Sequence, residues 1–167
     1  HLFYFLLPKD QIKIKMRMNK KVVSIPSYIP EEYKIEQKDF SSKTKKILFQ
    51  KDYLIPLINL AYARSGDKGN HANIGIIARK KDYFDFIDSE LNPSTISQFF
   101  NHVVQGDVLK WVLPGINGLN FLLKNSLGGG GMASFNIDPQ GKAYAQQLLE
   151  YPIPVTKEIF DQFQNKN

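Results

Sequence analysis

Apolar and polar positions change their pattern at about residue 50. Beyond it, four segments carry continuous or alternating apolar residues, which predicts strands over 54–63, 73–79, 108–113 and 133–137. Five segments repeat apolar residues every three or four positions, which predicts helices over 83–91, 96–103, 119–127, 139–152 and 157–163. These elements together predict a two-layer α+β sandwich, in which helices cover one face of a four-stranded sheet.

The first 50 residues have a different character. Apolar residues alternate with lysines over 9–21, so this segment can pair as a strand, whereas Pro26 and Pro30 break any helix and 34–51 is polar and Lys-rich. Residues 1–51 carry 12 Lys or Arg against 5 Asp or Glu, while the rest of the chain carries 10 against 11. We therefore predict a basic N-terminal extension over 1–50, a globular domain over 51–155 and a short C-terminal helix or tail over 156–167.

Composition narrows the possible chemistry. The chain has no cysteine and only three histidines, none with the spacing of metal ligands, so we expect no metal site. The apolar run 2–7 is far shorter than a membrane span, so no transmembrane segment is expected. The near-neutral globular part argues against a nucleic-acid enzyme. With Arg17 as its one arginine, the extension fits a basic arm that binds a partner protein, anionic lipid or RNA better than a cleavable targeting segment.

The main candidate site is the polar segment from Ala63 to Asn73, which we expect to form a glycine loop between two strands. Glycines let backbone N–H groups turn toward one point, and neighbouring cations add charge, so the segment suits a phosphate or carboxylate. The candidate anion-binding residues are Arg64, Ser65, Gly66, Lys68, Gly69, Asn70 and Asn73. Asp67 and His71 are the candidate catalytic residues. An ordinary polar hairpin with an internal Arg64–Asp67 ion pair fits the same composition equally well.

Two further turns could contribute to this site. The segment from Leu113 to Phe121 is predicted as a strand-to-helix turn, where Gly115 and Asn120 are candidate ligand residues and a tight turn capped by Asn117 is the simpler interpretation. The run of four glycines from Gly128 to Gly131 is predicted either as a flexible ligand loop, with Gly129 and Gly130 as contacts, or as a helix C-cap leading into a strand.

These segments together resemble one protein family. The runs 63–70 and 72–79, the Leu-Pro-Gly turn at 113–115 with 119–121, the glycine run and the segment 141–146 are similar to the C-terminal domain of the acyclic terpene utilisation (AtuA) family. The resemblance covers about residues 54–155. It implies a ferredoxin-like fold with a mainly antiparallel sheet, and a setting in the acyl-CoA metabolism of branched or terpenoid acids. In family members this domain follows a much larger one, and here the basic segment precedes it instead.

Two functions follow as hypotheses, and the sequence does not decide whether the chain is an enzyme. The first is a small accessory subunit of an acyl-CoA-metabolising complex, which binds a CoA ester or completes a site with a separately encoded AtuA-type large chain. The second is a structural subunit of a large mitochondrial assembly that has recruited the domain. We expect a mitochondrial location, or failing that a cytoplasmic one. No cofactor is evident beyond a CoA ester as ligand.

Overall fold

The computed structural model describes residues 7–8, 11–25 and 53–164, and the chain divides into two units, 1–39 and 40–167. In the first unit, strands β1 (Ile14–Met18) and β2 (Lys21–Ile25) form an antiparallel hairpin. Asn19 and Lys20 turn the chain with positive φ, as a two-residue hairpin loop requires. The predicted strand pairing in this part of the chain is confirmed. The predicted polar stretch 34–51, the two prolines, the apolar run 2–7 and the boundary at residue 50 lie outside the described residues.

The second unit is built on a four-stranded antiparallel sheet. Its strands lie in the order β4 (Ala61–Lys68), β5 (His71–Ala78), β7 (Gly118–Leu123) and β6 (Val108–Leu113). Because side chains alternate between the faces of a sheet, cross-strand partners share a face. One such row joins Ala63, Ile76, Leu119 and Val112, and the next one joins Ser65, Ile74, Phe121 and Lys110. These rows form the face that is buried in the core.

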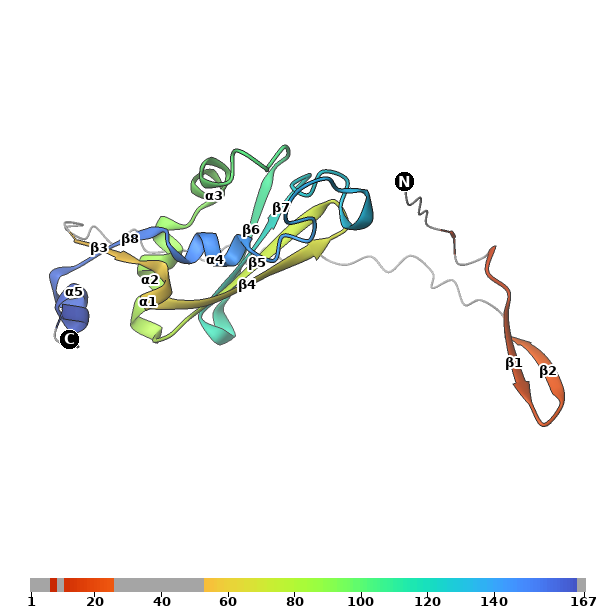
Figure 1. Ribbon diagram of the computed structural model, residues 1–167. Coiled ribbons are helices and arrows are strands. Elements are labelled where there is room, and N and C mark those ends of the chain that lie inside the picture. The colour runs from red at the N-terminus through yellow and green to blue at the C-terminus, as the bar shows by residue number, and fades with distance from the viewer. Residues whose placement is uncertain (1–6, 9–10, 26–52, 165–167) are drawn as a thin grey trace. The chain divides into compact units, whose positions relative to one another are not determined.

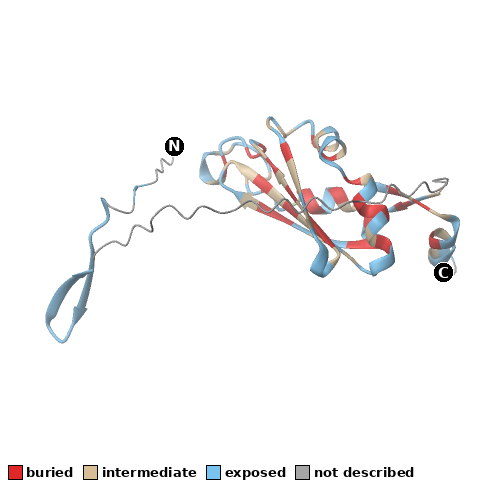
Figure 2. Cartoon of the chain, turned by 180° about the vertical axis from the view of Figure 1, so that it is seen from behind, coloured by how far each residue is buried: buried red, intermediate tan, exposed pale blue. Residues whose placement is uncertain are grey.

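Helices cover that buried face, as Figure 1 shows. They are α2 (Phe84–Glu90), α3 (Pro93–Phe99) and α4 (Tyr144–Leu149). The single turn α1 (Leu57–Leu60) directly precedes β4 and contacts α4. The 3₁₀ helix η2 (Lys81–Tyr83) leads into α2. Buried residues concentrate between the sheet and these helices, seen in red in Figure 2. The chain therefore forms the predicted ferredoxin-like two-layer α+β sandwich, and within residues 53–164 no helix covers the opposite face of the sheet.

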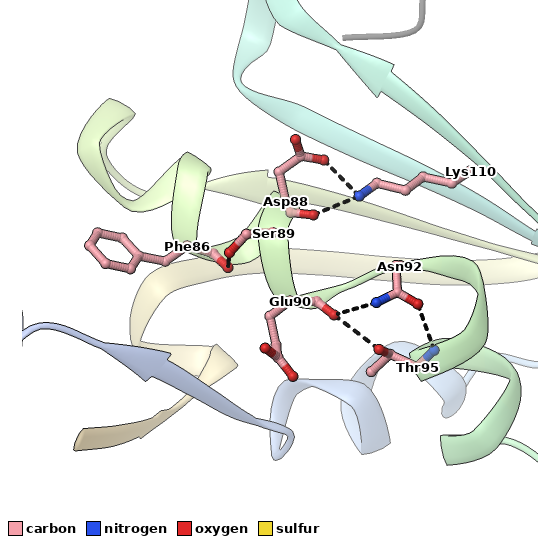
Figure 3. A network of polar contacts seen from close by, with 7 residues as sticks. All are labelled: Phe86, Asp88, Ser89, Glu90, Asn92, Thr95 and Lys110. Carbon is pink, nitrogen blue, oxygen red and sulfur yellow. Dashed lines mark hydrogen bonds and ion pairs between the residues drawn. The ribbon is translucent and has the colours of Figure 1, made fainter. Parts of the chain in front are cut away.

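A network of polar contacts fixes α2 between its neighbours (Figure 3). Lys110 of β6 forms an ion pair with Asp88 of α2, with 2.7 Å between Nζ and Oδ1. Asn92 caps α3 by accepting a hydrogen bond from the Thr95 N–H at 3.0 Å, and the Thr95 hydroxyl donates to the Glu90 carbonyl at 3.0 Å. The turn between α2 and α3 is thus held from both sides.

A second, two-stranded sheet extends the core at one end. Strand β3 (Tyr53–Pro56) pairs with β8 (Pro152–Val155), and α5 (Lys157–Gln164) follows, where a helix is predicted. The Tyr53 and Phe160 rings lie 4.8 Å apart between centroids, which ties α5 to β3. In the part of the chain that the structure describes, no helix is long and apolar enough to cross a membrane.

Three predicted elements are wrong, and the predicted helix 139–152 is reduced to α4. The segment 54–63 is not one strand, because α1 interrupts it between β3 and β4. The predicted helix 119–127 is strand β7 and a following turn: Leu119, Phe121 and Leu123 alternate in the core, which is a period of two. The predicted strand 133–137 pairs with no described strand, and Phe135 and Ile137 are 90% and 106% exposed. The 3₁₀ helix η4 (Gly131–Ala133) and bends occupy that segment.

Candidate ligand-binding groove

Arg64 lies midway along the edge strand β4, on the sheet face that no helix of residues 53–164 covers. The strand register places it in one row with Gly75, Asn120 and Trp111, which alternates with the buried rows. Within residues 53–164, its guanidinium makes no hydrogen bond or ion pair, so the predicted Arg64–Asp67 pair does not form. An arginine left without a protein partner on an open face keeps all five of its donors for a ligand.

A polar groove of about 370 Å³ lies beside Arg64. Its cations are Arg64, Lys68 and Lys142, and its acid is Asp67. The ammonium of Lys142 lies 3.9 Å from Oδ1 of Asp67, and the ammonium of Lys68 donates to the Asp67 carbonyl at 3.0 Å. Both lysine ammonium groups are therefore held close to Asp67, and the groove has excess positive charge.

Lys142 reaches the groove from a turn on the other side of β4. Asp138 holds this turn by accepting hydrogen bonds from the N–H groups of Lys142 and Ala143 at 2.9 and 2.7 Å. Buried Ser65 joins the turn to β4: its hydroxyl donates to the Lys142 carbonyl at 3.1 Å and accepts from the Ala145 N–H at 2.9 Å. Ser65 therefore positions Lys142, and its oxygen is already engaged.

Glycine and asparagine form the floor of the groove. A Cβ on Gly66 would lie 3.0 Å from the ammonium of Lys142, so glycine here gives that side chain its place. The Asn73 amide donates to the Asn120 side-chain oxygen at 3.2 Å, which links β5 to β7 in the floor. Of the predicted ligand residues, the structure thus brings together Arg64, Ser65, Gly66, Lys68 and Asn73, with Asp67 beside them and Asn120 next to Asn73.

The tip of the β4–β5 hairpin serves another purpose. Asn70 accepts a hydrogen bond from the Gly129 N–H at 2.7 Å, and its carbonyl accepts from the N–H groups of Ser126 and Leu127. Nδ1 of His71 accepts from the Asn125 N–H at 2.9 Å. These bonds fasten the hairpin to the segment after β7. Asn70 and His71 therefore engage their neighbours in the fold.

The glycine run packs against this tip. Its four glycines all have positive φ, and a Cβ on Gly130 would overlap the Gly69 carbonyl oxygen. Gly69 and Gly130 therefore meet backbone to backbone, and the run is neither a helix cap before a strand nor part of the groove. Gly115 is also separate, because it lies in the 3₁₀ helix η3 (Pro114–Ile116). The predicted single loop with its anion nest is wrong, since β4 continues to Lys68.

Two tyrosines, Tyr144 and Tyr151, have raised pKa values. Burial raises the pKa of Tyr144, and the carboxylate of Asp138 raises it further. Burial also raises the pKa of Tyr151, as does Glu90, which accepts a hydrogen bond from its hydroxyl at 3.2 Å. Among the described residues, no three His, Cys, Asp or Glu side chains gather to hold a metal ion.

Sequence reasoning missed Lys142 as a member of the groove. It stands far along the chain from Arg64, and only the strand order and the Ser65 contacts bring the two together. The segment 141–146 did appear among the matching blocks of the family resemblance, which was the one available signal.

The fold and groove define a ferredoxin-like domain with a cationic site on its open sheet face. The sequence model of the AtuA ferredoxin-like domain matches residues 55–154, which is more than half of the chain. The chain therefore belongs to the AtuA ferredoxin-like domain family. Searches among curated proteins and among solved structures find no significant match.

Proposed function

We propose that this chain is a small accessory subunit of an acyl-CoA-metabolising enzyme complex. In this proposal it binds an anionic ligand or completes a site on a partner, such as a separately encoded AtuA-type large chain, rather than catalysing alone. The observation that carries the proposal is the groove in which Arg64, Lys68 and Lys142 stand around a glycine floor.

The chemistry of these side chains suits the anionic groups of a CoA ester. The planar guanidinium of Arg64 can bind a phosphate or carboxylate through two parallel hydrogen bonds, and it has no competing partner among the described residues. Lysine ammonium groups add charge without fixed direction. Asp67 and His71 remain our candidate catalytic residues, although the imidazole of His71 already accepts a bond from Asn125.

Titration of coenzyme A and acetyl-CoA by calorimetry tests the proposal. We expect Arg64→Ala to weaken binding at least tenfold, because a charge-assisted bidentate contact is lost, and Arg64→Lys to recover part of it. Lys81→Ala is the matched control: it also removes one exposed positive charge, but from outside the groove. Equal affinity of the wild type and Arg64→Ala, with and without any co-purifying large chain, would exclude the proposed role of the groove.

The hairpin favours a second candidate function, that of a structural subunit in a large mitochondrial assembly. Ile14, Met16, Val23 and Ile25 share one face by register, while Lys15 and Arg17 lie on the other, and all are exposed. An amphipathic hairpin of this kind suits a partner protein, an anionic lipid surface or RNA. Native purification from mitochondria decides between the candidates: a membrane complex or ribosome supports the second, and an AtuA-type large chain supports the first.

A further inference from the structure

An apolar pocket of about 250 Å³ adjoins the polar groove on the open face of the sheet. The two share Arg64 and Gly75 among their lining residues. The large side chains around the apolar pocket are Tyr62, Ile77, Leu113 and Ile116. They are between 40% and 60% exposed, so they form an apolar patch beside a cluster of cations.

Two contacts fix the walls of this pocket. The guanidinium of Arg79 lies 3.8 Å from the centre of the Tyr62 ring and donates to the Ile58 carbonyl at 3.0 Å. This cation–π contact fixes the position of the Tyr62 ring. On the opposite side, a Cβ on Gly118 would lie 2.9 Å from the Ile76 carbonyl oxygen and 3.3 Å from Ile116. Glycine at 118 therefore allows Ile116 to close over the end of the sheet.

Gly75 stands where the two pockets meet. It pairs with Arg64 on one side and Asn120 on the other, in the middle of the sheet. Glycine weakens a strand interior, and a Cβ at this position would find no neighbour closer than 3.9 Å. The protein therefore has an empty space here that a side chain could fill, and this space connects the apolar pocket to the groove.

We propose that the groove and the apolar pocket form one site for an amphipathic organic anion. Arg64, with Lys68 and Lys142, binds a carboxylate or phosphate head group, and the apolar pocket holds an aliphatic chain attached to it. The inference rests on the proposed ligand-binding function of the groove and narrows its ligand to aliphatic carboxylic acids or alkyl phosphates. A second copy of this chain fits the face poorly, because a two-fold contact would bring the cations of both copies together.

The test measures binding of two probe series to the full chain by calorimetry: straight-chain carboxylates from acetate to octanoate, and the corresponding alkyl phosphates. We expect affinity to rise about threefold to fourfold for each added methylene until the pocket is full. A rise in affinity with chain length in both series supports the site, and the series that binds more tightly identifies the head group. Gly75→Val is the decisive variant, because valine favours strands and projects into the junction. It should keep the melting temperature of the wild type and remove the dependence on chain length.

Ile116→Ser gives an independent check, since this exposed side chain supports the pocket and not the core. It should reduce the gain per methylene and leave the affinity for acetate unchanged. Affinity that does not vary with chain length in the wild type, or a slope that Gly75→Val leaves unchanged, would overturn the inference. If coenzyme A still binds in an Arg64-dependent manner in that case, the proposed function stands. Chain-length dependence without coenzyme A binding would support this site and refute the accessory role in acyl-CoA metabolism.

Discussion

The ammonium of Lys110 donates a hydrogen bond to the backbone carbonyl of Asp88 at 2.8 Å and also lies 2.7 Å from the carboxylate of the same residue. The two side chains are 16% and 3% exposed. One cation therefore binds both the side chain and the main chain of α2 from strand β6, in a place that water barely reaches.

Removing one member of this pair should destabilise the fold strongly. Asp88→Ala removes the carboxylate and leaves the largely buried Lys110 ammonium only the backbone carbonyl of residue 88, and we expect a loss of about 3–5 kcal/mol in the free energy of unfolding. The double variant Asp88→Leu with Lys110→Met should recover most of that loss. Asp107→Ala is the control, because it breaks the exposed pair with Lys124 and should cost about 1 kcal/mol or less. Urea denaturation measures all of them, and equal losses for Asp88→Ala and Asp107→Ala would contradict the prediction.

Gly130→Ala should also destabilise the protein, by about 2–4 kcal/mol, because its Cβ would overlap the Gly69 carbonyl and its φ is positive. Gly115→Ala is the matched control, since no atom lies within 4 Å of its Cβ and its φ is not positive. Thermal melts of the two variants should differ clearly. Were Gly130→Ala to melt like the wild type, the glycine run would have to be freely rearranging.

Asn70→Ala should lower the free energy of unfolding by about 1–3 kcal/mol and leave ligand affinity largely unchanged. The substitution removes the hydrogen bond that the Gly129 N–H donates to Asn70 at 2.7 Å, and also the contact with Asn125. Asn101→Ala, at an exposed position, is the control and should be neutral. Hydrogen exchange at Gly129 should accelerate in the first variant alone. A variant of Asn70 that stays stable but loses anion binding would return this residue to the ligand site.

The raised pKa of Tyr144 predicts a loss of stability in alkali. Above pH 10 the unfolded chain releases this proton while the folded chain retains it, so stability falls as the pH rises through that range. Tyr144→Phe loses the hydrogen bond to the Ser126 carbonyl, at 2.8 Å, and should be about 1 kcal/mol less stable than the wild type near neutral pH. The gap should narrow toward pH 11 in urea titrations. A constant gap would contradict the assignment.

Local pattern predicted the sandwich and two strands of the sheet, 73–79 and 108–113, to within a few residues. It failed at 119–127 because Leu122 lies on the open face opposite Asn73, so that Leu119, Leu122 and Leu123 match a helical spacing as well. It also missed β8, since Pro152 and Pro154 count against a strand, yet a strand paired on one side only can accept them.

The residues of the candidate site fall into two groups: those that residue type alone identifies, and those whose role depends on contacts between segments distant in the sequence. Arg64, Lys68 and Asn73 were found because their residue types are informative by themselves. Asn70 and Gly129 were assigned to a ligand, whereas in the structure they bind each other. Their hydrogen bond joins segments that only the folded sheet brings together, so the sequence could not reveal it. Polar turn residues that bind a ligand and those that bind another turn have the same composition, so sequence alone could not separate them.

The side chain of Lys142 reaches the groove across the edge of β4. The complete cationic groove therefore depends on a residue that is synthesised much later than Arg64. Arg64 and Gly75 leave the ribosome long before the turn that carries Lys142, so a nascent β4–β5 hairpin holds only part of the cationic groove. A ligand that needs the whole groove would therefore bind only chains that already contain the turn with Lys142. At a concentration one hundred times its dissociation constant, it would add about 2.7 kcal/mol to the stability of those chains.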